Sequence, residues 1–182
     1  TTMSHTVTVT DVTLPSIVVS DINSNTDLGS CEAFLTVSLP AVSDNCSVIS
    51  ITNDYNGTSD ASGTYPLGVT TVTWTVTDGS GNSKTATQSV TILDQENPEI
   101  TININPLEEA NLGSCVASLV LATPVSSDNC GIASLVNSYN GSSDASGDYP
   151  VGTTNVTWTA VDNSGNVFTN VQVVTITDIE AP

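Results

Sequence analysis

Positive charge is almost absent from this sequence. Its 182 residues include one lysine or arginine, Lys84, against 19 aspartates and glutamates, for a formal net charge of −18. Such a surface repels phosphate backbones and anionic lipids, so we expect neither nucleic acid nor a membrane surface as a partner. The carboxylates have almost no basic side chains to pair with, which makes divalent cations or salt the candidate counter-ions. The alternative is that the charge only keeps a secreted repeat protein soluble.

Histidine and long apolar runs are also scarce. His5 is the only histidine, so a Ser-His-Asp triad is excluded, and we expect no enzyme activity. Composition alone leaves a carboxylate pair for glycoside hydrolysis open, but the acids lie in turns and junctions. No apolar stretch approaches about 20 residues, so no membrane insertion is expected. Residues 1–5 lack the features of a signal peptide, and we expect the chain to be a fragment of a longer secreted protein.

The sequence consists of two tandem copies of one unit. The stretch from Tyr65 to Asn82 returns over residues 149–166, an offset of 84 (149 − 65). Any function must therefore be one that a repeated unit can serve. We expect a first repeat over 15–97 and a second over 98–182. Residues 1–14 are expected to form a lead-in strand, because they resemble the end of a preceding repeat.

Alternating residues predict the centre of each unit. Val72, Trp74 and Val76 share one face of a strand, and threonines occupy the other. Turn residues follow over 78–82, and the alternation resumes near Val90, which predicts a β-hairpin with a buried tryptophan face. Further strands are expected at Ile17 to Val19, Glu32 to Leu39 and Val48 to Thr52, with polar loops over 21–30 and 53–63. With no helical periodicity, the pattern predicts an all-β fold of two tandem antiparallel β-sandwiches.

The four cysteines occupy matching places in the two repeats. Within each repeat the two cysteines lie 15 residues apart (46 − 31 and 130 − 115). No Cys-x-x-Cys motif is present, which argues against zinc or redox chemistry. We predict disulfides Cys31–Cys46 and Cys115–Cys130, and therefore an extracellular location. Each bridge is expected to stabilise the fold by roughly 3 kcal/mol.

Calcium is the only candidate cofactor. Asp94, Glu96 and Asn97 lie within four residues where one repeat meets the next, and hard cations prefer such oxygen ligands. Asp78 and Asp128, in nearby turns, are further candidate ligands. The alternatives are a polar linker that ends in a stop proline at the junction, and plain capped turns at Asp78 and Asp128.

The motifs together match a known pattern. Their order is Cys31, Ser43-Asp-Asn-Cys46, Gly63-x-Tyr65-Pro-x-Gly68, Val72-Thr-Trp-Thr-Val-Thr-Asp78, Ser80-Gly-Asn82 and Asp94-x-x-x-Pro98. This order resembles the hyalin repeat, an immunoglobulin-like extracellular module, and nearly the whole chain is covered by two copies. The resemblance implies tandem immunoglobulin-like sandwiches and a role in cell adhesion. The chain is also similar to repeats of giant surface adhesins of gliding bacteria. The family has no catalytic residues to transfer.

Two functions from different classes follow. The leading hypothesis is a structural spacer repeat of a cell-surface adhesin, with neighbouring repeats of the same chain as partners. The alternative is a module that binds carbohydrate or another surface polymer. Tyr55 and Tyr139, beside Asn-Gly loops, are then the candidate sugar-stacking residues.

Overall fold

The computed structural model describes residues 2–181, and β-strands are its only regular secondary structure. Accordingly, none of these residues belongs to a helix long and apolar enough to cross a membrane. The chain divides into two compact units, one of residues 1–27 with 31–93 and one of residues 28–30 with 94–182. The units therefore part between residues 93 and 94, four residues before the expected boundary. The all-β prediction is confirmed.

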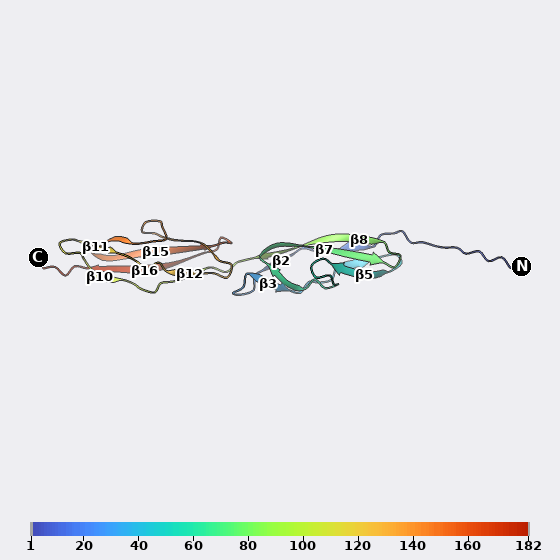
Figure 1. Ribbon diagram of the computed structural model, residues 1–182, viewed down its shortest axis with the longest axis horizontal. Coiled ribbons are helices and arrows are strands. Elements are labelled where there is room, and N and C mark those ends of the chain that lie inside the picture. The colour runs from blue at the N-terminus through green and yellow to red at the C-terminus, as the bar shows by residue number, and fades with distance from the viewer. Residues whose placement is uncertain (1, 182) are drawn as a thin grey trace. The chain divides into compact units, whose positions relative to one another are not determined.

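Each unit contains eight strands in the same order, labelled in Figure 1 where space allows. Those of the first unit are β1 (Ser16–Val18), β2 (Ile22–Asn25), β3 (Glu32–Leu35), β4 (Ala41–Ser43), β5 (Val48–Asn53), β6 (Gly63–Pro66), β7 (Gly68–Asp78) and β8 (Ser83–Leu93). Those of the second are β9 (Glu99–Thr101), β10 (Leu107–Glu109), β11 (Val116–Leu119), β12 (Val125–Ser127), β13 (Ile132–Asn137), β14 (Gly147–Pro150), β15 (Gly152–Asp162) and β16 (Val167–Thr177).

A long hairpin organises each unit. In the first unit β7 and β8, of 11 residues each, pair from Gly68 opposite Ile92 to Thr77 opposite Ser83. They form the middle of a four-stranded sheet in the order β2-β8-β7-β5, while β1–β4 and β3–β6 form separate pairs. The second unit repeats this topology with β10-β16-β15-β13, β9–β12 and β11–β14. The predicted hairpin is confirmed in both units.

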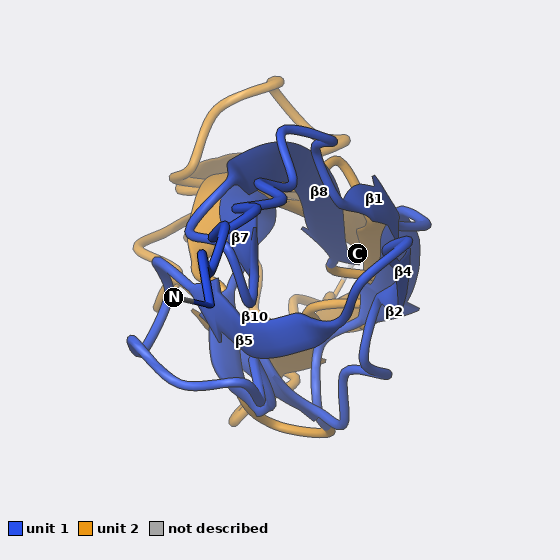
Figure 2. Ribbon diagram, turned by 90° about the vertical axis from the view of Figure 1, so that its right-hand side faces the viewer, with its two compact units in different colours: residues 1–27, 31–93 blue, residues 28–30, 94–182 orange. Residues whose placement is uncertain are grey.

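The core lies where the alternation of β7 predicts it. Val72, Trp74 and Val76 are fully buried, together with Val90 and Ile92 of β8. Figure 2 shows the strands of the first unit, in blue, arranged around this common centre. Apolar residues from β1, β3 and β6 complete the cluster, as expected of an immunoglobulin-like sandwich.

The buried tryptophan also needs a hydrogen-bond acceptor, and the structure supplies one. Trp74 Nε1 donates to Gln88 Oε1 at 2.9 Å, and Gln88 Nε2 donates to the carbonyl oxygen of Ser20 at 2.6 Å. Trp158 makes the same connection through Gln172 in the second unit. The relay satisfies the buried indole and ties the bend after β1 to the core.

Three expectations about strands were wrong. The expected polar loop over 21–30 contains β2, which pairs parallel with β8, as β10 pairs parallel with β16. The sandwiches are thus not purely antiparallel. The strand β4, at Ala41–Ser43, was not expected. Residues 2–15 form no strand, because a strand needs a paired neighbour and the described structure gives these residues none.

The chain enters and leaves each unit at opposite ends of the hairpin. Near the entrance, Asn82 Nδ2 in the β7–β8 loop donates to the carbonyl oxygen of Asp11 at 3.2 Å. At the exit, Leu93 follows Ile92, which lies opposite Gly68, the first residue of β7. Ten steps of about 3.3 Å along β7 separate these ends by roughly 33 Å.

Candidate functional site

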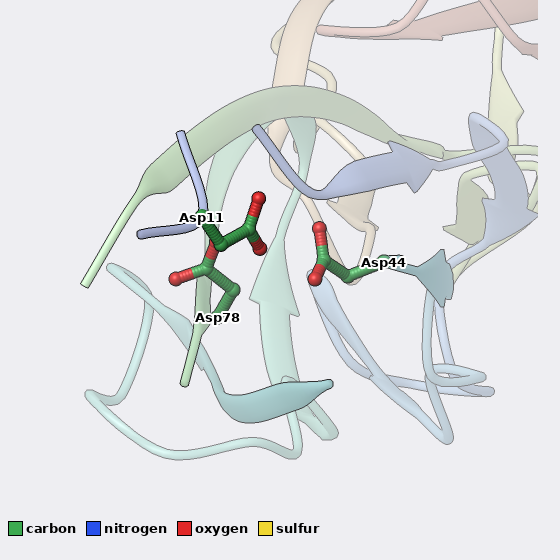
Figure 3. Close-up of side chains that lie close together, drawn as sticks. All are labelled: Asp11, Asp44 and Asp78. Atoms are coloured by element: carbon green, nitrogen blue, oxygen red, sulfur yellow. The ribbon is translucent and has the colours of Figure 1, made fainter. Parts of the chain in front are cut away.

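Two clusters of aspartates lie at the entrance ends of the two units. Asp11, Asp44 and Asp78 form the first acidic cluster, and Figure 3 shows the carboxylates of Asp11 and Asp44 facing each other. The second acidic cluster consists of Asp94, Asp128 and Asp162. In each cluster one oxygen of every carboxylate lies within 4.8 Å of the others. Each cluster joins three segments that are far apart in sequence.

The hairpin loop positions the last aspartate of each cluster. Asp162 Oδ1 accepts hydrogen bonds from the backbone N–H groups of Ser164 and Asn166, both at 2.8 Å. Asn166 Nδ2 donates to Asp162 Oδ2 at 2.7 Å and to the carbonyl oxygen of Asp94 at 3.3 Å. Gly165 completes the turn with a positive φ of 92°. The turn thus fixes Asp162 and holds the entering chain beside it, as the loop at Asp78 does in the first unit.

The Ser-Asp-Asn-Cys turns position the middle aspartates. Asp44 Oδ2 accepts from the N–H of Cys46 at 2.8 Å, and Asp128 Oδ2 accepts from the N–H of Cys130 at 2.8 Å. Within residues 2–181, the other oxygen of each, Oδ1, is buried and has no hydrogen-bond partner. Each turn therefore presents one satisfied and one unsatisfied carboxylate oxygen.

The entering chain supplies the remaining aspartate of each cluster in the same way. Asp11 Oδ1 accepts from the N–H of Thr13 at 2.9 Å, and Asp94 Oδ1 accepts from the N–H of Glu96 at 3.0 Å. Their Oδ2 atoms are buried with no hydrogen-bond partner among the residues described. The Asp94 side chain is only 6% exposed.

Hydrogen bonds outweigh the effect of burial on the pKa of three of these carboxylates, Asp11, Asp78 and Asp162. Burial acts to raise the pKa of Asp78 and of Asp162, but donors from their own turns outweigh it and hold both pKa values below the usual range. The N–H of Thr13 and the amide of Asn45 likewise lower the pKa of Asp11. Since Lys84 is the one basic residue of the chain besides His5, nearby side chains cannot neutralise two such clusters.

The structure separates the five predicted metal ligands into three groups. Asp94 and Asp128 lie together in the second cluster, whereas Asp78 belongs to the first. Asp78 is at the last residue of β7, and the chain leaves the first unit at the opposite end of that strand, beside Gly68. Asn97 and Glu96 line a shallow depression beside Asp128, and Glu96 Oε1 accepts from the N–H of Gly29 at 2.8 Å.

Three cluster members, Asp11, Asp44 and Asp162, were not among the predicted ligands. A signal existed in the sequence, because 128 − 44 and 162 − 78 both give the repeat offset of 84, and 94 − 11 gives 83. Aligning acids between repeats points to all six residues. The alignment does not show that the three aspartates of one repeat lie close together, because their proximity depends on the register in which the strands pair.

The predicted intrarepeat disulfides are not formed. Cys31 and Cys130 are disulfide-bonded, whereas Cys46 and Cys115 are free. Within the first unit, Leu67, just before β7, donates its N–H to the carbonyl oxygen of Cys31. Cys46 instead lies at the entrance end, where its backbone N–H donates a hydrogen bond to Asp44 Oδ2. The two cysteines are thus separated by about the length of β7, while a disulfide requires Cα atoms roughly 4.4–6.8 Å apart.

The second unit separates its cysteines in the same way. The N–H of Val151, just before β15, donates to the carbonyl oxygen of Cys115 at 3.0 Å. Asn163, just after β15, donates through Nδ2 to the carbonyl oxygen of Cys130 at 3.0 Å. Equal spacing of 15 residues therefore marked equivalent places in two repeats and not a bonded pair.

The candidate sugar-stacking tyrosines are engaged within the fold. The Tyr55 ring stacks on Tyr65 with centroids 4.4 Å apart, and Tyr139 stacks on Tyr149 at 4.5 Å. Tyr55 Oη donates to the carbonyl oxygen of Thr64, and Tyr139 Oη to that of Asp148. Each tyrosine therefore has one ring face and its hydroxyl occupied by its own domain.

Comparison with known proteins agrees with the repeat pattern. The HYR domain model matches residues 10–92 and 93–176. Hyalin of Strongylocentrotus purpuratus is 31% identical over 172 residues, which cover 93% of this chain and 14% of that protein. Hyalin of Lytechinus variegatus is 32% identical over 130 residues, which cover 70% and 23%. The chain thus spans less than a quarter of either relative.

Solved structures similar to the chain include Drosophila N-cadherin EC1-4. It is 9% identical, with a TM-score of 0.45 and coverage of 92% of this chain and 50% of that one. The family assignment rests on the HYR domain model, which accounts for most of the sequence in two adjoining matches. The resemblance to the hyalin repeat is confirmed, and the chain belongs to the HYR domain family as two consecutive copies of the domain.

Proposed function

We propose that this chain is a structural repeat of an extracellular adhesion protein, in which each HYR domain serves as a spacer. The observation that carries the proposal is the path of the chain, which enters one end of the long hairpin and leaves at the other. Each domain then adds roughly 33 Å between whatever lies before and after it.

The interior of each domain suits a load-bearing role. A fully buried tryptophan sits at the centre of each core and is hydrogen-bonded to a glutamine on the neighbouring strand. The β7–β8 ladder runs nearly the whole length of the first domain, and β15–β16 does so in the second. An extracellular location is supported by the disulfide-bonded state of Cys31 and Cys130.

The alternative function, binding of carbohydrate or a surface polymer, has weaker support. It depends on Tyr55 and Tyr139, whose rings and hydroxyls already stabilise their own domains. We propose no catalytic role, since the acidic clusters lie in turns and are not accompanied by a histidine.

Force spectroscopy on the reduced chain, held by its two ends, tests the spacer function. Two separate unfolding events are expected, each lengthening the chain by about 25 nm, because some 80 residues at about 3.5 Å each replace a folded span of roughly 3 nm. Smooth extension without such events contradicts a spacer. Selective binding on a glycan array that is lost in Tyr139→Ala favours the alternative.

A further inference from the structure

We propose that each HYR domain of this chain binds one calcium ion in the acidic cluster at its entrance end. The inference concerns the site itself and does not depend on the spacer function. Nothing in the resemblance to other proteins is needed for it, because both clusters carry the same unsatisfied atoms.

Within the described part of the chain, the same carboxylate oxygens lack hydrogen-bond partners in both clusters. Buried polar atoms in folded proteins are almost always hydrogen-bonded, and exceptions need a reason. In the first cluster the exceptions are Asp11 Oδ2 and Asp44 Oδ1, and in the second they are Asp94 Oδ2 and Asp128 Oδ1. The same two atoms are left open in both domains. A cation bound by both oxygens accounts for their lack of hydrogen-bond partners.

The second cluster is deeply buried. Asp94 is more than nine-tenths buried, and its open oxygen belongs to a group that lies within 4.8 Å of two other carboxylates. Burying a charged oxygen without a partner is costly, and placing it beside like charges increases that cost. A bound cation removes both penalties at once.

The donor atoms of both clusters suit calcium. Each cluster offers three carboxylates, and Asn129 Oδ1, next to Asp128, is also buried without a partner in the part of the chain described. All these atoms are hard oxygen donors, the set preferred by calcium and magnesium. Calcium tolerates irregular geometry and takes six to eight oxygens, so backbone carbonyls and water can complete the shell. Three turns from distant segments suit calcium better than the strict octahedron of magnesium.

Hydrogen bonds within the turns already order both sites. One oxygen of each of Asp11, Asp44, Asp94 and Asp128 is bound by a backbone N–H, which fixes the direction of the open oxygen. The Asp162 oxygens both accept from the hairpin loop, but each carboxylate oxygen retains further acceptor capacity. Little conformational entropy is therefore lost when an ion binds.

Isothermal titration with calcium chloride, after removal of bound metal with EDTA, counts the sites. We expect two ions per chain, one in Asp44→Asn, one in Asp128→Asn and none in the double variant. Asparagine is chosen because its Oδ1 can keep accepting from the turn N–H while an NH₂ group replaces the open oxygen. The variants should therefore stay folded in EDTA, which tryptophan fluorescence checks.

Matched controls remove one charge outside the clusters. Glu32→Gln in the first domain and Glu109→Gln in the second, both exposed, should still bind two ions. The proposal is overturned by an absence of calcium binding up to millimolar concentration, by folded Asp44→Asn and Asp128→Asn variants that still bind two ions, or by an equal loss in the controls. Magnesium chloride that binds as tightly as calcium chloride overturns the assignment to calcium.

Discussion

The two acidic clusters use the same turns, yet the second is more enclosed than the first. Asp11 is half-buried, whereas its counterpart Asp94 is buried. Asn45 Nδ2 donates to Asp11 Oδ1 at 3.2 Å, but Asn129 Nδ2 donates to the carbonyl oxygen of Ser30 at 2.7 Å. The Ser-Asp-Asn-Cys turn has the same sequence in both clusters and orients its carboxylate in the same way. The burial of the carboxylates differs, as do the segments that pack beside the two turns.

A short segment, residues 28–30, is hydrogen-bonded to residues beside the second cluster. Residues 28–30 group with the second unit, where Ser30 binds Asn129 and Gly29 binds Glu96. Since electrostatic attraction strengthens as water is excluded, a cation in the second cluster should be held more tightly.

The cores should be equivalent even though the clusters are not. Trp74→Ala and Trp158→Ala should each lower the free energy of unfolding of their own domain by about 3–5 kcal/mol, because both indoles are fully buried. Urea titration in EDTA, followed by circular dichroism, measures the change. Phe34→Ala, at a site 61% exposed, is the control and should change stability by about 0.5 kcal/mol or less. A mild effect at only one tryptophan contradicts equivalence.

The deeper burial of the second acidic cluster should give it a higher calcium affinity than the first. The Asp44→Asn variant retains only the second cluster, and Asp128→Asn retains only the first. We expect the remaining site of Asp44→Asn to bind more tightly, by on the order of tenfold, which corresponds to about 1.4 kcal/mol. Titration calorimetry gives both dissociation constants. Equal affinities would contradict the idea that deeper burial of the second cluster strengthens binding.

Acid should weaken the metal-free fold through the loop aspartates. The pKa values of Asp78 and Asp162 are lower in the folded state than the value of about 3.8 expected in the unfolded chain. Both residues therefore stabilise the fold above about pH 3.8, and this stabilisation is lost as the pH falls through the folded-state pKa. The unfolding free energy in EDTA should therefore decline below about pH 4, and Asp162→Asn should flatten that decline for the second domain. A decline that is equally steep in Asp162→Asn rules out this role.

Thiol reactivity should show the smallest difference. The Asp11 carboxylate beside it, together with burial, raises the pKa of the free Cys46 thiol. Because the thiolate is the reactive form, iodoacetamide should alkylate Cys46 at pH 8 more slowly than Cys115, which lies at the other end of its domain. Peptide mass spectrometry over time measures both rates. Labelling of Cys31 or Cys130 before reduction contradicts the disulfide assignment.

What the sequence could predict depends on whether the signal is local. The alternation around Trp74 and the turn at Asp78 are local patterns, and both are found in the structure. The strand β2 has one apolar residue, Ile22, so its sequence shows no apolar alternation, although Ile22 packs against the core and the strand pairs with β8. The cysteine pairing was wrong for a related reason, since equal spacing says nothing about which end of the sandwich each cysteine occupies.

Only three of the six cluster aspartates, Asp78, Asp94 and Asp128, were predicted as ligands from the sequence. Asp94 and Asp128 stood out because acids gather at the junction, but their partner Asp162 lies 68 residues beyond Asp94 (162 − 94). Their meeting depends on the β15–β16 register and on the amide of Asn166, which binds both Asp162 and Asp94. Sequence spacing does not encode such a register directly.

Thermal unfolding in EDTA and in millimolar calcium tests the central claim, that each domain holds a cation where its chain enters. A site filled at 100 times its dissociation constant adds about 2.7 kcal/mol, which should raise the midpoint by roughly 10 °C or more for domains of this size. We predict that rise for the wild-type chain and none for the Asp44→Asn, Asp128→Asn double variant. Superimposable wild-type curves in EDTA and calcium would contradict the account.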